Sequence, residues 1–382
     1  MDIYNTANQA FERLYGTPAQ HHFQAPGRVN LIGEHTDYND GFVLPAAIDY
    51  QTLIVGNSRA DRMVNLVAVD LSEARSSFNL DQPIEHDDQA PWSDYVRGVC
   101  DVLRKAGYQL SGADLLITGN VPQGAGLSSS ASLEIVTART MTQLAGETLS
   151  GTQAALFSQQ AENQFVGCQC GIMDQLISAR GQQGHAALID CRSLTTQPVP
   201  MPTDAAIVII NSNVKRGLVD SEYNQRRLQC EAAARHLQVP ALRDASLEQL
   251  EQARDGMDPV TYRRARHIIT ENERTLAAAE ALAQSDWPRI SKLMAASHAS
   301  MRDDFEITVA PIDGLVAMIA DLLGDQGGVR MTGGGFGGCV VSLAPEHRVD
   351  AVIERVNQHY EAEFGIEPTV YVCHPVNGAY PD

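Results

Sequence analysis

Apolar and polar residues follow one another along the chain in patterns that predict both strands and helices. Short runs rich in apolar and β-branched residues predict strands at 30–32, 52–55, 65–69 and 115–118. Apolar residues that recur every three or four positions predict helices, each ending near a glycine, at 129–145 and 152–166. Strands and helices are therefore mixed in the first half of the chain.

A proline-rich segment near the middle of the chain predicts a domain boundary. Residues 197–202 include three prolines in five positions, which forbid a helix and disfavour a central strand. The next segment, 206–210, is a continuous apolar run typical of a buried strand. A helical region follows at about 220–296, broken near Pro240 and Pro259, and then come a helix, a strand, a helix and a strand at 312–323, 340–343, 351–361 and 369–372. These patterns predict an α+β fold of two domains, 1–200 and 201–382, each combining a mixed sheet with helices.

Composition narrows the class of protein. The 382 residues are 44% hydrophobic and 20% charged, which is typical of a globular protein with a sizeable core. The 28 basic and 47 acidic side chains leave a net charge of −19, whereas proteins that bind nucleic acid carry a basic surface. No secretory signal and no apolar run of about 18 residues occurs. We expect a soluble, cytoplasmic protein that binds neither nucleic acid nor membranes.

The first of two glycine-rich segments, GNVPQGAGLSSSAS at 119–132, has the surroundings of a phosphate-binding loop. It follows a predicted strand and runs directly into a predicted helix. Glycines let backbone N–H groups approach a phosphate, and the first turn of a helix adds unpaired N–H groups and a favourable dipole. A serine-capped helix is the simpler alternative, but three consecutive serines, two close glycines and a proline exceed what a cap requires. The lysine of GxxxxGK[ST] is absent, which excludes the ordinary P-loop NTPases.

The second segment, GGGFGG at 333–338, matches GxGxxG only formally. A dinucleotide-binding loop is followed by a helix, whereas a predicted strand follows here. The pattern therefore predicts a tight hairpin between two strands. Its glycines allow close approach to a ligand or to another loop, and a purely structural hairpin is the alternative.

A dense polar cluster follows the apolar residues at 31 and 32. Glu34, His35, Asp37 and Tyr38 come directly after Gly33. Two carboxylates and an imidazole on a loop that leaves a strand are suited to bind vicinal hydroxyl groups, and a polar surface loop is the alternative. The spacing matches no metal-binding motif.

These three segments together resemble the galactokinase family of the GHMP kinases. GRVNLIGEHTDY at 27–38 matches the galactokinase signature, GAGLSSSAS at 124–132 resembles the phosphate loop of the superfamily, and GGGFGGC at 333–339 resembles its third motif. The similarity extends through most of the chain and is loosest at about 60–90 and 240–285. It implies a two-domain GHMP-kinase fold with the active site at the domain interface. The implied reaction transfers the γ-phosphoryl group of ATP to the C1 hydroxyl of α-D-galactose, giving α-D-galactose 1-phosphate, the first committed step of galactose metabolism.

The resemblance also implies the catalytic groups. Asp174 corresponds to the catalytic aspartate, which either accepts the proton of the attacking hydroxyl or orients that hydroxyl, and Arg28 corresponds to the arginine that keeps it ionised. Mg²⁺ would be ligated by Ser130 and Glu162, although from the pattern alone Glu162 could point inward or to solvent. The phosphates would be cradled by the loop residues Gly124, Ala125, Gly126, Leu127, Ser128, Ser129 and Ser130.

The two substrates have further implied contacts. Trp92 and Tyr95 match aromatic residues near adenine, and core packing is an equal alternative for them. The sugar would contact Glu34, His35, Thr36, Asp37, Gly171 and Tyr223. Because Tyr223 comes from the second domain, the sugar would lie between the domains, where ligand pockets are common. The implied partners are galactose and MgATP, bound to a monomer or weak homo-oligomer.

Two other functions are compatible with these motifs. A kinase for a related sugar, such as N-acetylgalactosamine, arabinose or glucuronate, would share them, although the complete signature at 27–38 favours galactose. The second compatible function is that of a non-catalytic sensor that binds galactose and ATP. Known sensors of this kind have altered phosphate loops, so the intact LSSSA at 127–131 and Asp174 disfavour it.

Overall fold

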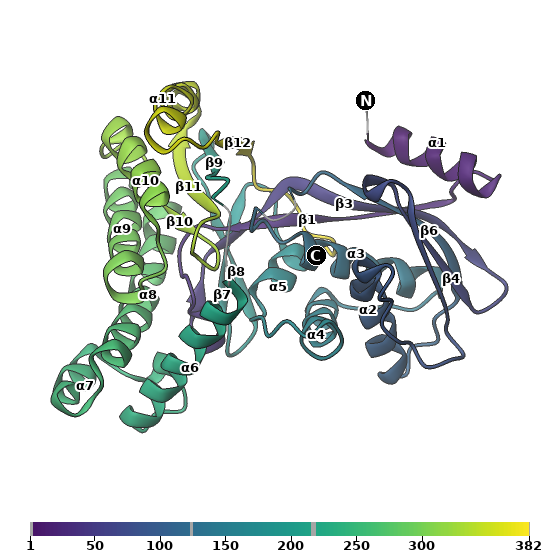
Figure 1. The fold of residues 1–382 in the computed structure, drawn as a ribbon, viewed down its shortest axis with the longest axis horizontal. Coiled ribbons are helices and arrows are strands. Elements are labelled where there is room, and N and C mark those ends of the chain that lie inside the picture. Colours follow the sequence, from purple (N-terminus) through teal and green to yellow (C-terminus); the bar gives the residue numbers. More distant parts are fainter. Residues whose placement is uncertain (1–2, 123–124, 215–218, 382) are drawn as a thin grey trace.

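Three β-sheets, covered by helices, organise the part of the chain that the computed structural model describes, residues 3–122, 125–214 and 219–381 (Figure 1). The strands are β1 (His21–Asn30), β2 (Phe42–Val43), β3 (Pro45–Arg59), β4 (Met63–Ala68), β5 (Ala74–Asn79), β6 (Gly112–Gly119), β7 (His185–Asp190), β8 (Thr195–Pro200), β9 (Ala205–Asn211), β10 (Gly328–Thr332), β11 (Cys339–Pro345) and β12 (Thr369–Cys373). The α-helices are α1 (Ile3–Tyr15), α2 (Asp94–Lys105), α3 (Ser129–Leu144), α4 (Gly151–Ala161), α5 (Met173–Arg180), α6 (Val219–Leu237), α7 (Leu247–Gln252), α8 (Pro259–Ala283), α9 (Trp287–Ser300), α10 (Ala310–Leu323) and α11 (Glu346–Phe364). The fold is α+β, as expected.

A five-stranded sheet forms the centre of the N-terminal half, in the order β1-β3-β6-β4-β5. Its neighbouring strands are antiparallel except β4 and β6, which run parallel. Successive residues of a strand point to opposite faces. Leu53 and Val55 of β3 therefore pack with α1, whereas Ile54 joins the cluster formed with helices α2 to α5 on the other face (Figure 1).

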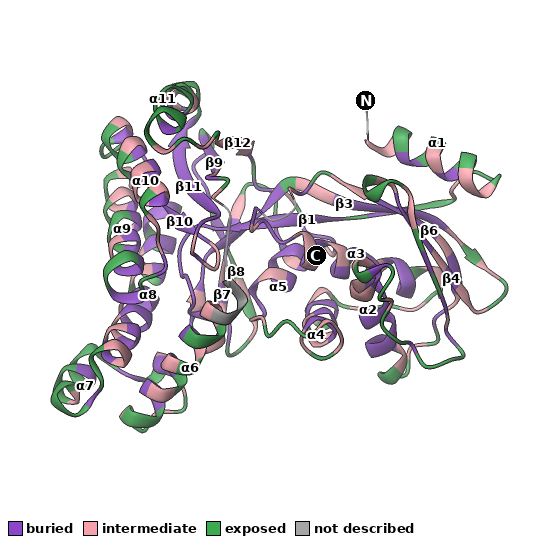
Figure 2. Ribbon diagram, in the orientation of Figure 1, coloured by how far each residue is buried: buried purple, intermediate pink, exposed green. Residues whose placement is uncertain are grey.

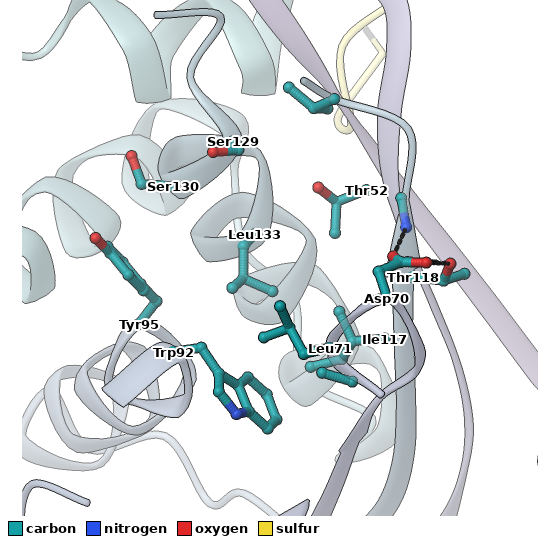
Figure 3. Close-up of a pocket in the computed structure, with 13 residues that line it drawn as sticks. Thr52, Asp70, Leu71, Trp92, Tyr95, Ile117, Thr118, Ser129, Ser130 and Leu133 are labelled. Carbon is teal, nitrogen blue, oxygen red and sulfur yellow. Dashed lines mark hydrogen bonds between the residues drawn. The ribbon is translucent and has the colours of Figure 1, made fainter. Parts of the chain in front are cut away.

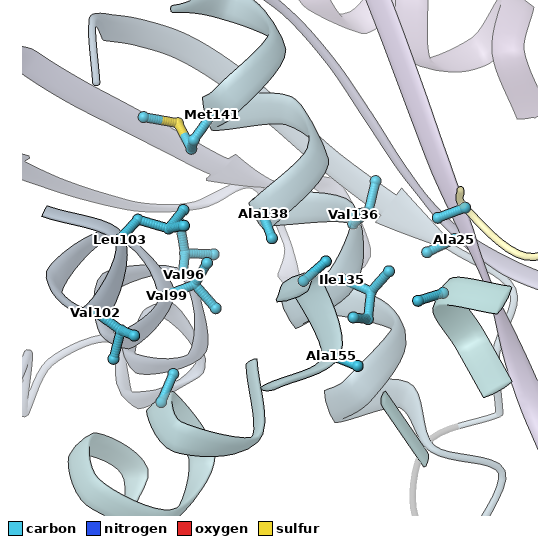
Figure 4. Packing of buried hydrophobic residues seen from close by; sticks show 14 of the residues in the cluster. Ala25, Val96, Val99, Val102, Leu103, Ile135, Val136, Ala138, Met141 and Ala155 are labelled. Atoms are coloured by element: carbon cyan, nitrogen blue, oxygen red, sulfur yellow. The ribbon is translucent and has the colours of Figure 1, made fainter. Parts of the chain in front are cut away.

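Helix α3 is the central helix of this half. Its periodic apolar residues predict one buried face, but the helix lies between the sheet and helices α2, α4 and α5, so most of its sides are covered. Ile135, Val136, Ala138 and Met141 belong to the apolar cluster (Figure 4). Glu134 is also completely buried, a point on which the site depends.

The C-terminal half contains a four-stranded antiparallel sheet in the order β10-β11-β9-β12. The apolar run 206–210 lies within β9, which has partners on both sides and is buried (Figure 2), so that prediction is confirmed. Thr332 pairs with Cys339 across the segment 333–338, which confirms the predicted hairpin. Helix α8 packs on α9, and α9 and α10 pack against β10.

The two halves share an apolar core. Leu31 and Ile48, near the five-stranded sheet, belong to the same buried cluster as Ile209 of β9 and Val341 of β11. The proline-rich segment forms β8, an edge strand of the small sheet β2-β7-β8, where prolines are tolerated. The boundary at residue 200 between two domains stays a prediction.

Two predicted elements differ from the observed ones. The strand expected at 30–32 ends at Asn30, because the chain turns at Gly33, whose φ of +96° favours glycine. The helix expected at 152–166 is α-helical only to Ala161 and continues as the π-helical turn η4 (Glu162–Val166). The helical region expected at about 220–296 is broken near both prolines, as expected, because α6 ends before Pro240 and Pro259 is the first residue of α8. Across the ranges that the structure describes, no helix combines the length and apolarity needed to cross a membrane.

The packing of α3 can be tested by removing part of one core side chain. Ile135 is fully buried, so we expect Ile135→Ala to lower the free energy of unfolding by about 3 kcal/mol, because it removes apolar burial and leaves a cavity. Leu276→Ala on α8 is the control, because its side chain is 39% exposed, and it should change stability by about 0.5 kcal/mol or less. Urea denaturation measures both values. Equal losses in the two variants would contradict the packing described.

Candidate active site

The site is organised around a buried ion pair between Arg28 and Asp174. Nε and Nη2 of Arg28, on β1, donate to Oδ1 and Oδ2 of Asp174 at 2.8 and 2.6 Å, and Asp174 lies in the first turn of α5. The pairing of β1 with β3 shifts register between Pro26 and Arg28, an irregularity that redirects a side chain. Arg28 is only 8% exposed. Burial lowers its pKa, but the charge and hydrogen bonds of Asp174 outweigh burial and raise it, so Arg28 is charged.

The phosphate loop is attached to this ion pair. Gly124 lies outside the described residues, and the structure describes the loop from Ala125 onward. Nη1 of Arg28 donates to the carbonyl of Gly126 at 2.6 Å, and the hydroxyl of Ser128 donates to Oδ2 of Asp174. Ser128 has a left-handed φ of 58° and precedes α3, and within the described residues no side-chain cap is formed there. The first-turn N–H groups of α3 are therefore available to an anion.

Ser130 and Glu162 lie together, as a pair of magnesium ligands requires. The hydroxyl of Ser130 hydrogen-bonds to the carboxylate of Glu162, which is 6% exposed at the start of η4. Glu162 therefore points inward. Its pKa is raised by burial and then by the charge of Asp174, so a cation at this point would be favoured. Mg²⁺ prefers hard oxygen ligands and is usually completed by phosphates and water, so the donor set fits, although the described residues hold no cluster of three or more His, Cys, Asp or Glu suited to a metal.

Behind Glu162 lie two buried residues that the sequence patterns did not single out. Nε2 of Gln175, on α5, donates to Glu162 Oε2 at 2.6 Å and to Glu134 Oε2 at 3.2 Å. Glu134 is completely buried, and burial followed by the charge of Glu162 raises its pKa well above the usual range. Its position on a helix rich in apolar residues gave no signal of this contact.

A pocket of about 220 Å³ opens on the ion pair. It gathers most of the residues expected at the sugar together with those expected at the phosphoryl group, namely Arg28, Glu34, His35, Asp37, Glu162, Gly171, Asp174 and Tyr223. Tyr223 belongs to α6 of the C-terminal half, and its ring lies 5.0 Å from that of His35. Residues from both halves therefore meet in one pocket.

Thr36 is the expected sugar contact that the structure does not bring to this pocket. It is fully buried, and its hydroxyl donates to the carbonyls of Gly33 and Phe42 at 3.0 and 2.6 Å. Its side chain stabilises the turn instead. The sequence pattern did not separate it from Glu34, His35 and Asp37 because it lies within the same polar run.

The carboxylate of Glu34 accepts most of its hydrogen bonds from other residues of the protein. Nη2 of the fully buried Arg330 lies 2.6 Å from Glu34 Oε2, and the N–H of Gly333 donates to Oε1 at 3.1 Å. Nδ2 of Asn30 is a third donor, at 3.3 Å. A carboxylate has about four acceptor positions, so Glu34 keeps one for a ligand. Arg330 had no signal in the sequence, because a buried arginine in a strand is identified only by its partners.

His35 presents a neutral imidazole to the pocket. Its Nδ1 lies 2.7 Å from the hydroxyl of Tyr38, and its Nε2 has no hydrogen-bond partner among the described residues. Burial, followed by the charge of His267, lowers its pKa to about 3. A neutral imidazole can donate to or accept from a hydroxyl group.

Gly171 and Asp37 approach each other closely at the same pocket. A Cβ atom at Gly171 would lie 1.8 Å from Asp37 Oδ2, so only glycine fits at this position. Burial and then the charge of Asp174 raise the pKa of Asp37 to about 6. The carboxylates of Asp37 and Asp174 thus lie near each other in the pocket at a cost in electrostatic free energy.

A second pocket, of about 240 Å³, lies beside the N-terminal turns of α3 (Figure 3). Its walls include Trp92 and Tyr95, together with apolar residues of which Leu71, Ile117 and Leu133 are labelled in the figure. Ser129 and Ser130 lie at one end and Trp92 at the other. We call the pocket of about 220 Å³ the sugar pocket and the pocket that contains Trp92 and Tyr95 the aromatic pocket. Because Ser130 of the aromatic pocket also bonds to Glu162, which lines the sugar pocket, the two pockets meet at the first turn of α3.

Comparisons with known proteins agree with this geometry. Residues 9–58 match the galactokinase galactose-binding signature, 94–182 match the GHMP kinases N terminal domain and 278–362 match the GHMP kinases C terminal. The galactokinase of Lactococcus lactis, solved with galactose, is 34% identical over 98% of this chain and 99% of its own, with a TM-score of 0.92. The mevalonate kinase of Methanococcus jannaschii is 18% identical over 94% of this chain and 98% of its own, with a TM-score of 0.65, and shares the fold.

The fold and both domain matches define a GHMP kinase, an ATP-dependent enzyme with α+β halves. Within that class the identity to the Lactococcus enzyme and the signature at residues 9–58 are specific. The chain belongs to the galactokinase family.

The raised pKa of Asp37 predicts a pH-dependent gain in stability for Asp37→Asn. The native pKa of about 6 lies above the value of about 3.9 in an unfolded chain. Between pH 4 and 6 the native state therefore binds more protons than the unfolded state. As a result, this carboxyl group lowers the stability of the protein as pH rises through that range. Asparagine does not ionise, so the variant does not lose stability for this reason as pH rises. We expect the variant to be about 1–2 kcal/mol more stable than the wild type at pH 7.5, with a smaller gain at pH 4.5. Urea denaturation at both values measures the difference, and a gain that does not change with pH would contradict the stated cause.

Proposed function

We propose that this chain transfers the γ-phosphoryl group of MgATP to the C1 hydroxyl of α-D-galactose. One observation carries the proposal: the Arg28–Asp174 ion pair lines a pocket that also holds the sugar-signature residues, next to a phosphate-binding helix terminus. The proposed partners are galactose and MgATP. A cytoplasmic location and a monomer or weak homo-oligomer stay predictions.

The nucleotide would bind across the two pockets. Adenine would lie against Trp92 and Tyr95 in the aromatic pocket, while the phosphates follow the loop residues Gly124, Ala125, Gly126, Leu127, Ser128, Ser129 and Ser130 toward the sugar pocket. Backbone N–H groups of the loop and of the α3 terminus would bind the phosphate oxygens. Because Ser128 already donates its hydroxyl to Asp174, we propose that it orients the catalytic carboxylate as well.

Ser130 and Glu162 would hold Mg²⁺ beside the phosphates. The ion neutralises phosphate charge and orients the transferring group. Gln175 and Cys170 both donate to Glu162 Oε2, at 2.6 and 3.3 Å. These contacts, together with that of Ser130, direct the carboxylate.

The sugar hydroxyls would be bound by Glu34, His35, Asp37, Gly171 and Tyr223. Acceptors predominate among these groups, which suits a ligand whose polar groups are hydroxyl donors. Glu34 offers one acceptor position and His35 a neutral imidazole. We propose no direct sugar contact for Thr36, because its hydroxyl is committed to the turn.

Asp174 would act on the attacking hydroxyl. Arg28 and Ser128 donate three hydrogen bonds to its carboxylate, which leaves an acceptor position on Oδ1 for the C1 hydroxyl. In the transfer, the bond from the C1 oxygen to the γ-phosphorus forms, the bond from that phosphorus to the β,γ-bridging oxygen breaks, and the hydroxyl proton passes to Asp174. Both positioning and charge neutralisation contribute to such a reaction, and Arg28 supplies positive charge at this point.

A panel of monosaccharides tests the reaction and the role of Asp174 together. With MgATP, galactose should be phosphorylated far faster than arabinose, glucuronate or N-acetylgalactosamine, and Asp174→Asn should lower kcat about 100-fold or more, because the amide cannot accept the proton. Asp255→Asn, in an exposed turn, is the control and should keep wild-type kcat. Formation of ADP measured with a coupled assay gives the rates. Galactose binding without ADP formation would indicate a sensor, and no response to galactose would contradict the proposed substrate.

Removing the charge of Glu162 should weaken the binding of Mg²⁺ specifically. Glu162→Gln keeps the shape but not the charge, so we expect the Mg²⁺ concentration for half-maximal activity to rise about tenfold or more. Glu280→Gln, on the exposed side of α8, is the control. Activity measured as a function of free Mg²⁺ at constant ATP gives the result. An unchanged Mg²⁺ dependence in Glu162→Gln would exclude it as a ligand.

A further inference from the structure

The backbone of the sugar-signature loop is held by a helix from the other half of the chain. β1 ends at Asn30, and the N–H groups of Gly33 and Glu34 donate instead to Oε1 of Glu271, at 3.1 and 3.3 Å. Glu271 lies on α8 and is completely buried. It falls in the region 240–285, where the family resemblance is loosest, so no sequence motif pointed to it.

The same helix also holds the carbonyl of Glu34, which belongs to the next peptide. Nε2 of His267 lies 3.1 Å from the carbonyl oxygen of Glu34, and Nδ1 lies 2.9 Å from the hydroxyl of Ser300. Burial is the main reason that the pKa of His267 is lowered to about 4, so the ring is neutral. The carbonyl oxygen can only accept, so the proton of the neutral ring lies on Nε2, which donates to it. The Ser300 hydroxyl lies beside Nδ1 and also 3.3 Å from Oδ2 of Asp304. Both polar groups of the Glu34 backbone are therefore bound by α8.

The loop conformation explains why such anchoring is needed. His35, directly after Glu34, has a left-handed φ of 62°, which is strained for a non-glycine residue and persists only where neighbouring structure enforces it. Gly41 is also close to α8, because a Cβ atom there would lie 2.3 Å from Oδ1 of Asn272. That same Oδ1 accepts from the N–H of Phe42 at 2.9 Å. The helix thus fixes the loop at both ends.

Glu271 is a strong acceptor because it is charged. Burial raises its pKa, but Arg274, His267, Arg330 and a hydrogen bond from Ser297 outweigh burial and lower the pKa to about 2. Nε of Arg274 donates to Oε2 at 2.7 Å, and the hydroxyl of Ser297 donates to Oε1 at 2.6 Å. Hydrogen bonds to an ionised acceptor are about twice as strong as those between neutral groups.

We propose that Glu271 and His267 are positioning residues for sugar recognition. By holding the Glu34 peptide, they set the direction in which the carboxylate of Glu34 and the imidazole of His35 face the sugar hydroxyls. Neither residue lines the sugar pocket or the aromatic pocket, so their effect reaches the sugar only through the loop. That the ligand is galactose rests on the proposed function, whereas the anchoring of the loop rests only on its hydrogen bonds with α8.

Kinetics of Glu271→Gln separate positioning from a general structural role. The amide keeps one acceptor oxygen but loses the charge and sets an N–H₂ donor against either the loop or Arg274. We expect KM for galactose to rise about tenfold or more, because bonds to charged groups contribute most, while KM for ATP stays within twofold and kcat within threefold. Ser297→Ala is the matched control, because it removes a donor from the same oxygen without touching the loop, and it should leave KM for galactose nearly unchanged.

A second variant and a ligand-free measurement keep the proposal testable. His267→Gln should shift KM in the same direction, and amide hydrogen exchange of the peptide containing Gly33 and Glu34 should become at least tenfold faster in Glu271→Gln but not in Ser297→Ala. Equal rises in KM for galactose and ATP, or unchanged exchange in Glu271→Gln, would overturn the proposal. If the wild type does not phosphorylate galactose, the proposed function fails. The exchange rates still decide whether α8 anchors the loop.

Discussion

The ion pair between Arg28 and Asp174 is the interaction on which the rest of the site depends. It joins β1 to α5, and through Gly126 and Ser128 it also holds the phosphate loop. Arg28 is buried and the side chain of Asp174 is 26% exposed, so loss of Asp174 would leave the charge of Arg28 largely buried without its partner and would destabilise this junction. The same pair that stabilises the junction also places a carboxylate and a positive charge in the pocket that holds the sugar-signature residues. Structure and proposed chemistry therefore use the same contacts.

The charge of the whole protein describes its surface and says little about this site. The net charge is −19, yet the proposed phosphate site has local sources of positive potential in Arg28 and the α3 N-terminus. Carboxylates nevertheless crowd the site, and the pKa of Asp37 is raised first by burial and then by repulsion from the charge of Asp174. A cation near Glu162 would relieve part of this repulsion. Binding of a metal-bound nucleotide, as proposed, would thus be electrostatically coupled to the acidic sugar pocket.

Sequence patterns predicted the residues whose chemistry is local and missed those whose role comes from packing. The glycine-rich loop, the hairpin at 333–338 and the polar run after Gly33 can each be identified from composition within a few positions. In the structure, residues of the polar run and of the hairpin line one pocket, and Ser129 and Ser130 of the loop line the other. Glu134, Glu271 and Arg330 lie on periodic helices or a strand, where a charged residue is normally exposed. Only the tertiary arrangement reveals that each is buried with a partner. Thr36 shows the opposite error, because a polar residue inside a motif can serve the turn instead of the ligand.

In the proposed reaction, the sugar hydroxyl and the phosphoryl group meet at Asp174, between the two halves of the chain. A crystal structure with galactose and a non-hydrolysable ATP analogue with Mg²⁺ would test this arrangement. We expect the C1 hydroxyl to lie about 3 Å from Oδ1 of Asp174, within hydrogen-bond reach, and to face the γ-phosphorus, with the adenine beside Trp92. Galactose bound with C1 directed away from Asp174, or a nucleotide outside the pocket next to α3, would contradict it.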